Sequence, residues 1–398
     1  MRFPWHILLF IFFPFAAFAQ YGVITGKVRN AETKNPLSRA SVFLGNSSVG
    51  TISSEDGSFT LNDVRQGQYT LVVSILGYEQ YSKTLLVGTE PIRLDIELTP
   101  KPLMLREVVI QSSADWKKNY EAFRKEFIGS DENAKQCFVI NPHILNITYN
   151  PTKQVLHADA DEFLIVENRA LGYRVKFLLN DFNDDKVANI ISHSGQQVFE
   201  DLPGSDAQKK KWHQKREEAY YGSSMHFYRS LLADKLTEEG FQIYNFSRYL
   251  NPKRPPDEVI KQKIRQFYDQ RRPDSQKYYV DLANMSKYYN ESLMRPALNQ
   301  FEVLIQTGQP GVYGMHFIRN YLYVVYTKKT DDTYDRDLYR PLDFPNYAVS
   351  VLTLLNGPYV LFDKNGIEIE NAPLHEGAWA RNRLSDMLPV NYVPDVVK

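Results

Sequence analysis

The chain has 398 residues, of which 47 are basic and 47 acidic, so its formal net charge at pH 7 is zero. A balanced chain produces no overall field that would draw it towards nucleic acid or an anionic membrane, so an electrostatic partner would have to meet a local patch. The length is sufficient for two or three domains, at roughly 150 residues each.

The N-terminal segment has the pattern of an export signal. Arg2 precedes the apolar run 7–18, and the sequence AFA, which ends at Ala19, is the small-x-small pattern after which signal peptidase cuts. We expect residues 1–19 to be removed; the alternative is an uncleaved anchor, but the run is short for a membrane span and contains Pro14. We predict an exported protein, periplasmic or associated with the outer membrane, without a later transmembrane span.

Cys137 is the single cysteine and can form no disulfide within the chain. A catalytic thiol would need a histidine and an orienting group nearby. Cys137 lies instead in the apolar sequence CFVI of a predicted strand, where a buried free cysteine is common. We expect this residue in the core.

Residues 20–100 show short runs in which apolar and polar residues alternate. Val42 and Leu44 belong to one such run, and Leu71 and Val73 to another. A period of two indicates strands with one buried face, and turn residues at close spacing separate the runs. This pattern predicts an all-β sandwich.

The same segment resembles the carboxypeptidase regulatory-like domain. The matching positions are Gly26-Lys27-Val28, Pro36-Leu37, Ala40, Val42, Thr51, Asp56-Gly57, Phe59, Gly67, Tyr69, Leu71, Val73-Ser74 and Gly77-Tyr78. The resemblance implies a transthyretin-like β-sandwich, a module found beside zinc carboxypeptidases and at the front of many Gram-negative cell-envelope proteins. Arg39 departs from the family pattern, which usually has glycine there.

The acidic stretch SSEDGSF, residues 53–59, belongs to this pattern and has two interpretations. Asp56-Gly57 suits a tight hairpin, because glycine accepts a positive φ and the aspartate side chain can cap the turn. A calcium loop would need more oxygen ligands in alternation than Glu55 and Asp56 provide. We therefore predict a turn.

A linker at 101–114 is expected to lead into an α+β domain at 115–398. In the linker, the sequence LREVVI at 105–110 is similar to the join between such a sandwich and the plug of TonB-dependent receptors, but too few residues follow for plug and barrel together. After the linker, the helical spacing of Trp116, Tyr120, Phe123 and Phe127 predicts an amphipathic helix with an aromatic stripe. The predicted fold class is a mainly β N-terminal sandwich followed by an α+β domain.

Parts of this second region also resemble a family of exported Gram-negative proteins. These proteins carry the same front sandwich and have no assigned activity. The resemblance rests on the sequences NRALGYRVKFLL, KKKWHQKREEAYYGSSMHFYRSLLADKLTEEGF and EGAWARNRLSDMLPVNY. It implies a localisation and an architecture, and it implies no catalytic residue.

The histidine spacing argues against a zinc carboxypeptidase. Those enzymes bind zinc with a His-x-x-Glu pair and a distant third histidine, and none of the eight histidines here is followed by glutamate at the third position. The motifs H-E-x-x-H and G-x-S-x-G are absent as well. We predict no enzyme, no catalytic residue, no metal and no cofactor, although glycosidase carboxylates leave no local signature.

Two surface clusters are candidates for binding. In the sequence HADADE, which also contains Glu162, the residues His157, Asp159 and Asp161 would alternate onto one solvated face if this stretch were a strand. The second cluster is a basic run with an aromatic residue, which could dock an anion such as a phosphate or an acidic glycan, or could be the solvated face of a helix. Its residues are Lys209, Lys210, Lys211 and Trp212.

The leading hypothesis is an exported, envelope-associated protein that binds or docks a protein or a glycan without catalysis. The alternative is a hydrolase acting on envelope polysaccharide or peptide, with Asp159, Asp161 or Glu162 among its acid and base groups. A nucleic-acid partner is not expected outside the cytoplasm. A deep cleft with converging carboxylates would favour the enzyme, and a shallow aromatic face would favour binding.

Overall fold

The computed structural model describes residues 21–101, 112–333 and 338–395. The predicted signal segment 1–19 and the LREVVI motif at 105–110 lie outside these residues. Within the described ranges, no helix has the length and apolar composition needed to span a bilayer.

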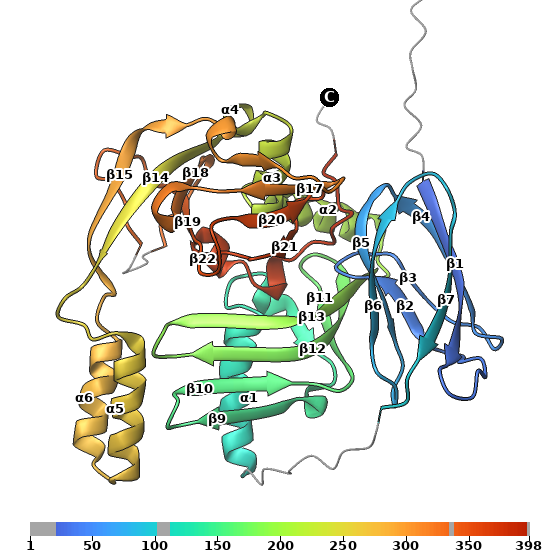
Figure 1. Ribbon diagram of the computed structural model, residues 1–398, viewed down its shortest axis with the longest axis horizontal. Helices are drawn as coiled ribbons and strands as arrows, with labels where there is room; N and C mark the ends of the chain where they lie inside the picture. The colour runs from blue at the N-terminus through green and yellow to red at the C-terminus, as the bar shows by residue number, and fades with distance from the viewer. Residues whose placement is uncertain (1–20, 102–111, 334–337, 396–398) are drawn as a thin grey trace, which may run out of the picture.

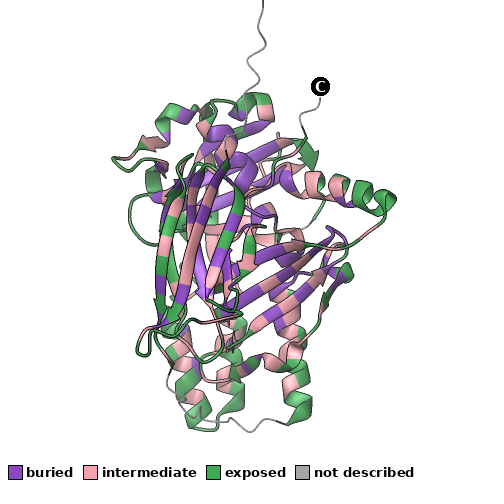
Figure 2. Cartoon of the chain, turned by 90° about the vertical axis from the view of Figure 1, so that its right-hand side faces the viewer, coloured by how far each residue is buried: buried purple, intermediate pink, exposed green. Residues whose placement is uncertain are grey.

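The N-terminal part is a β-sandwich, which confirms the predicted fold of this region (Figure 1). Its strands are β1 (Tyr21–Asn30), β2 (Ser41–Leu44), β3 (Gly50–Ile52), β4 (Ser58–Arg65), β5 (Gly67–Ser74), β6 (Tyr81–Val87) and β7 (Ile92–Leu98). One sheet has the order β4-β1-β7 and the other the order β3-β2-β5-β6. The predicted apolar positions, among them Val42, Leu44, Leu71 and Val73, fill the space between the sheets. Figure 2 shows the resulting change between buried and exposed residues along these strands.

The SSEDGSF stretch forms the turn that leads into β4. The Asp56 carboxylate accepts hydrogen bonds from the backbone N–H and the hydroxyl of Ser58, at 3.1 and 2.6 Å. These bonds hold the pKa of Asp56 below its usual value. Gly57 has a φ of +76°, and a side chain there would meet the Val28 carbonyl oxygen at 2.4 Å. Both residues of the Asp-Gly pair therefore serve the turn.

The middle of the chain forms a six-stranded antiparallel sheet with a helix packed on one face. The helix is α1 (Ser113–Phe127), and the strands are β8 (Cys137–Val139), β9 (Asn146–Asn150), β10 (Val155–Asp159), β11 (Phe163–Asn168), β12 (Tyr173–Asp185) and β13 (Ile190–Asp201). The strand order is β8-β11-β12-β10-β9, and β13 also pairs with β12. In Figure 1, α1 crosses behind this sheet.

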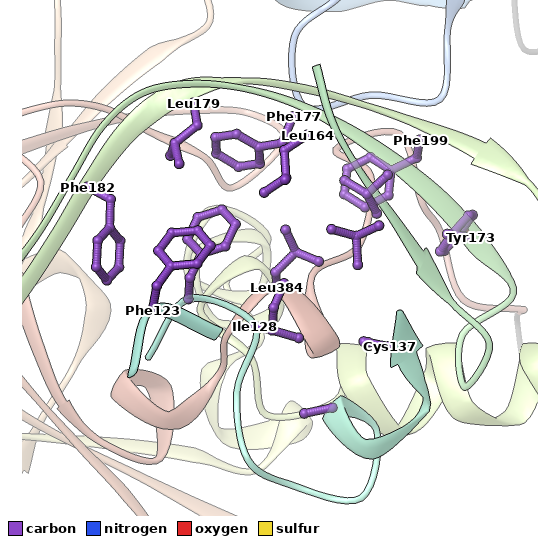
Figure 3. Packing of buried hydrophobic residues seen from close by; sticks show 14 of the residues in the cluster. Phe123, Ile128, Cys137, Leu164, Tyr173, Phe177, Leu179, Phe182, Phe199 and Leu384 are labelled. Carbon is purple, nitrogen blue, oxygen red and sulfur yellow. The ribbon is translucent and has the colours of Figure 1, made fainter. Parts of the chain in front are cut away.

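The predicted amphipathic helix is confirmed. Buried aromatic side chains of α1 pack against apolar side chains of the sheet and form the core with them. Phe123 is fully buried, and its ring centroid lies 5.0 Å from those of Phe127 and Phe182 (Figure 3). Cys137 is also buried, as predicted, and burial raises the pKa of its thiol to about 12. Such a thiol stays protonated and packs as a small apolar group.

The C-terminal part contains two further sheets and several helices, so the predicted α+β character of the second region is confirmed. The first sheet has the order β15-β14-β18-β19-β22, and the second has the order β16-β17-β20-β21. Their strands are β14 (Phe241–Leu250), β15 (Tyr288–Leu298), β16 (Leu304–Gln306), β17 (Val312–Met315), β18 (Tyr321–Thr330), β19 (Tyr347–Thr353), β20 (Val360–Asp363), β21 (Glu368–Glu370) and β22 (Leu374–Gly377). The helices are α2 (Asp206–Tyr220), α3 (Ser224–Leu232), α4 (Leu236–Glu239), α5 (Asp257–Asp269), α6 (Pro273–Ala283) and α7 (Ala378–Arg381). Short 3-10 helices lie at Ala134–Gln136, Pro142–Ile144, Gln300–Glu302, Ile318–Asn320 and Leu384–Asp386.

A helical hairpin, α5 and α6, is inserted between β14 and β15 and extends beside the six-stranded sheet (Figure 1). Ile260 and Ile264 of α5 are fully buried and form a small core with Val187, which follows β12. Arg254 donates to the Val187 carbonyl oxygen at 3.0 Å. The hairpin is therefore attached to the sheet and not only to the strands that carry it.

The sandwich is packed onto the rest of the protein. Phe43 and Val72, on the outer face of its second sheet, form a small apolar cluster with Leu178 and Val198 of the six-stranded sheet. The C-terminal segment adds a second attachment, because Val390 lies in the sandwich core and its N–H donates to the Asn46 carbonyl oxygen at 2.6 Å. The front module is thus integrated into the body of the protein.

Replacing Val198 by aspartate should weaken this packing. The change places an unpaired carboxylate against apolar side chains, and we expect it to lower the free energy of unfolding by about 2 kcal/mol. Urea unfolding of the variant and the wild type measures the difference. Val259→Asp on α5 is the matched control, because Val259 is 40% exposed. Equal losses in both variants would contradict the packing of the sandwich on this sheet.

Candidate functional site

The face of the six-stranded sheet opposite α1 is polar and partly open. Alternate residues of its strands point to this side, and the register places His157 of β10 directly between Thr148 of β9 and Asn183 of β12. Ser192 of β13 pairs with Asn183 and continues the same row onto the next strand. We call this surface, defined by Thr148, His157, Asn183 and Ser192, the open face. Leu156, the residue before His157 on β10, points to the opposite side of the sheet and is buried in the core that contains the α1 side chains.

Helix α5 borders the open face and encloses a groove with a volume of about 770 Å³. This sheet groove is lined from the strands and the loop after β12 by Thr148, Asn150, Lys153, Val155, His157, Asn183, Asp185, Ala188, Ile190 and Ser192, and from α5 by Asp257, Glu258 and Lys261. Most of these side chains carry hydroxyl, carboxamide, imidazole or charged groups. The volume lies within the range of about 300 to 1,000 Å³ that is common for ligand sites.

The acidic residues of the sheet groove are held by basic partners. Lys261 of α5 contacts Asp185 at 2.8 Å and thereby ties the helix to the sheet. Asp257 accepts hydrogen bonds from Arg254 at 2.6 Å and Lys287 at 2.9 Å. Burial alone would raise the pKa of Asp257, but these two cations outweigh it and keep the pKa below its usual value. Asp257 therefore stays ionised at neutral pH.

A polar cluster continues from His157 along the open face. One imidazole nitrogen lies 3.2 Å from Asp159, and the other lies 3.3 Å from Asp181 and 3.4 Å from Asn183. Asn146 of the edge strand β9 donates to Asp159 at 3.0 Å. The histidine is thus fixed between two carboxylates at the border of the sheet groove.

Only one of the three acidic residues predicted from HADADE belongs to this cluster. Asp159 is the last residue of β10, and Asp161 and Glu162 lie in the exposed turn that follows. Asp161 forms an ion pair with Lys101 at 3.2 Å. The expectation that Asp161 continues the alternation of Asp159 is wrong, because the strand ends before it. The second carboxylate beside His157 comes instead from Asp181 of the neighbouring strand β12.

The predicted basic run is divided between surface and interior. Lys209, Lys210 and Lys211 are exposed on α2. Trp212 is only 8% exposed, and its indole N–H donates to the Arg169 carbonyl oxygen at 2.9 Å. The prediction of Trp212 as a surface residue is therefore wrong. The three lysines are on the surface as expected, but the buried Trp212 ring does not contribute to the surface that they form.

Within the described part of the chain, no group of three His, Cys, Asp or Glu side chains has an arrangement that could hold a metal ion. The sheet groove residues Asn183, Ser192 and Lys261 were not identified from the sequence. The alternation of polar residues along β12 and β13 is the signal that could have indicated Asn183 and Ser192.

Comparison with known proteins identifies the front module. Residues 24–110 match the family model of the CarboxypepD_reg-like domain. The N-terminal sandwich is a domain of this kind, which confirms the resemblance inferred from its sequence. Among curated proteins, none matches the chain.

Several solved structures share a limited likeness with this protein. A pilus 2b backbone protein of group B streptococcus has 20% identity over 21% of this chain and 42% of its own, with a TM-score of 0.19. A putative carbohydrate binding protein from Bacteroides uniformis has 10% identity over 46% of this chain and 99% of its own, with a TM-score of 0.18. A putative membrane-associated protein of unknown function from Bacteroides fragilis has 10% identity over 89% and 98%, with a TM-score of 0.17. At these TM-scores, the likenesses carry no conclusion about fold or role.

Proposed function

We propose that this is an exported, cell-envelope-associated protein that binds a glycan in the sheet groove without catalysing a reaction. The observation that carries the proposal is the open face itself, where polar side chains from four strands meet α5 around a groove of about 770 Å³. The export signal pattern at residues 1–19 and the CarboxypepD_reg-like domain at 24–110 support the envelope location.

The chemistry of the open face suits a sugar chain. Sugar hydroxyl groups donate and accept hydrogen bonds, and Asn183, Thr148 and Ser192 can do the same. Short side chains on adjacent strands lose little conformational entropy when a ligand binds, because the sheet already fixes their positions. Val155 and Ile190 lie in the adjacent row, on either side of Asp185, and offer apolar contact to the C–H groups of a sugar ring. An open groove lined by four strands and a helix fits an oligosaccharide better than a compact metabolite.

The state of the carboxylates supports binding over catalysis. A hydrolase that cleaves glycosidic bonds needs one protonated carboxylic acid and a second carboxylate facing the scissile bond. Asp257 is held ionised by Arg254 and Lys287, and Asp185 is paired with Lys261. These two carboxylates are engaged with basic side chains, which leaves the hydroxyl, carboxamide and imidazole groups of the groove for recognition.

The double variant His157→Ala, Asn183→Ala tests the proposal. Both residues are half-buried on the open face, so we expect glycan affinity to fall at least tenfold while thermal stability changes little. The measurement is retention of the mature chain on an array of envelope oligosaccharides, followed by titration calorimetry with the best-retained one.

Lys210→Ala on α2 is the matched control for that experiment, because Lys210 is exposed and does not line the sheet groove. Its affinity should equal that of the wild type. Retention of no oligosaccharide, or equal affinity for wild type and double variant, would overturn the glycan proposal. If the chain instead captured a protein, and the His157→Ala change abolished that capture, the ligand of the sheet groove would be a protein and not a glycan.

A hydrolase on envelope polysaccharide or peptide is the second candidate. The observation that favours it is the position of His157. Asp159 and Asp181 hold its ring in one orientation, as carboxylates do for a histidine that acts as a general base. Incubation of the wild type with envelope polysaccharide and peptide substrates distinguishes the two. The binding proposal predicts no release of reducing ends or free amines, and release that His157→Ala abolishes would establish the hydrolase.

A further inference from the structure

A second hollow lies where the sandwich meets the C-terminal part of the chain. It has a volume of about 230 Å³ and is formed between β5 and β6 of the sandwich, β13 of the six-stranded sheet and the β20–β21 hairpin. We call it the junction cavity. It is separate from the sheet groove, because the two share no lining residue.

The clearest sign of a missing ligand is Gln196 of β13. Its side-chain oxygen is buried and has no hydrogen-bond partner among the described residues. Buried polar atoms in proteins are nearly always paired, so each exception calls for an explanation. Gln196 lines the junction cavity, and a hydroxyl group in the cavity could donate to it.

The sandwich wall of the cavity also carries hydrogen-bonding groups. Thr70 of β5 pairs with Thr84 of β6, and Gln68 lies two residues from Thr70 on the same face. Tyr69 points to the opposite side and is buried in the sandwich core. The outer face of this sheet is therefore apolar at Val72, where it packs on the body, and polar at the junction cavity.

The opposite wall provides a carboxylate but no cation. Glu368 of β21 accepts hydrogen bonds at one oxygen from the Tyr228 hydroxyl at 2.8 Å and from His375 at 2.9 Å. None of the described residues that line the cavity is a lysine or an arginine. Asp363, which is 4% exposed, is a second carboxyl group there, so an anionic ligand would find no cationic partner among the lining residues.

We propose that the junction cavity binds the ring of a small uncharged sugar. Gln68, Thr70, Thr84 and Gln196 can donate to and accept from its hydroxyl groups, and Glu368 can accept from them. Ile367, Ile369 and Val390 line the remaining wall and can contact the apolar C–H face of the ring. Because its walls come from three parts of the chain, a bound sugar would also hold the sandwich against the body.

The test uses the mature chain and saturation-transfer NMR with single sugars. Glucose and N-acetylglucosamine are the neutral probes, and glucuronate and inorganic phosphate are the anionic ones. The double variant Thr70→Val, Gln196→Leu removes two hydrogen-bonding groups with little change in volume. Thr60→Val is the matched control, because Thr60 is exposed on β4 of the other sheet.

We expect a transfer signal from at least one neutral sugar, an affinity reduced at least tenfold in the double variant, and no change in Thr60→Val. The groove variant His157→Ala, Asn183→Ala should keep this signal, which separates the cavity from the proposed function of the sheet groove. Thermal unfolding should show the double variant folded. No signal from either neutral sugar, equal binding by the double variant, or equal binding of glucuronate would overturn the proposal.

Discussion

Replacing Arg248 by alanine is expected to lower the free energy of unfolding by about 3 to 5 kcal/mol. The side chain of Arg248 is fully buried and lies between two carboxylates. Its Nε contacts Glu291 of β15 at 2.6 Å, and its Nη1 contacts Glu376 of β22 at 2.5 Å. The guanidinium also lies 4.0 Å from the ring centroid of Tyr288. Alanine would leave two half-buried carboxylates without the fully buried cation that they share, so the loss should exceed that of an exposed ion pair.

Urea unfolding measures this loss, and a triple variant separates charge from volume. Arg248→Met combined with Glu291→Gln and Glu376→Gln removes all three charges and keeps most of the packing. We expect it to recover at least half of the stability lost in Arg248→Ala. A loss below about 1 kcal/mol in the single variant would show that this cluster does not hold β14, β15 and β22 together. The cluster matters for the site because β14 and β15 carry the α5–α6 hairpin, which forms one wall of the sheet groove.

The second large effect concerns pH and the residue Asp386. Burial and the neighbouring carboxyl group of Asp131 raise the pKa of Asp386 to about 7, from an ordinary value of 3.8. A raised pKa in the folded state means that folding favours the protonated form. The stability that this proton provides is complete below about pH 4 and is lost as the pH rises to about 7. We expect the wild type to lose about 3 kcal/mol of stability over this interval from Asp386.

Asp386→Asn should remove that pH dependence. The carboxamide stays neutral, can still accept from Asn133, which now donates to Asp386 at 2.8 Å, and can donate to Asp131. At pH 8 the variant should be more stable than the wild type, and at pH 4 the two should be equal within about 0.5 kcal/mol. Urea unfolding at both pH values provides the measurement. A variant that is less stable than the wild type at pH 8 would show that the ionised Asp386 carboxylate stabilises the folded protein, which would contradict a raised pKa.

Local patterns in the sequence predicted the elements whose packing is also local. The alternation around Val42 and Val73 defines strands of the sandwich, and the aromatic spacing that includes Phe123 and Phe127 defines α1 and its buried face. Arg39 departs from the glycine of the family pattern, and the structure shows why glycine suits that position. Its φ is +59°, in the region that glycine adopts most easily.

Trp212 shows where the sequence pattern fails. A tryptophan in a basic run suggests an exposed binding residue, and nothing nearby in the sequence indicates otherwise. Its indole is buried because two glycines, one of them 40 residues earlier in the chain, allow close approach. A side chain at Gly172 would meet the ring at 2.2 Å, and one at Gly204 would meet it at 2.5 Å. Such contacts depend on tertiary packing, which local periodicity does not encode.

The sheet groove could be predicted only in part for the same reason. The polar character of β10 is visible in the sequence, and Asp159 was identified there. The residues that complete the site, Asn183 and Lys261, come from β12 and from a helix inserted after β14. Strand register and the position of the α5–α6 hairpin bring them together. Neither can be deduced from the spacing of residues along the chain.

The central claim is that the open face binds a glycan, and hydrogen exchange with mass spectrometry tests it most directly. The mature chain is measured alone and saturated with the oligosaccharide that the array retains best. We predict slower amide exchange in peptides of β9, β10, the first half of β13 and α5, with little change in β1, β4 and β7 of the sandwich. Protection confined to the sandwich, or no change under saturating ligand, would contradict the claim.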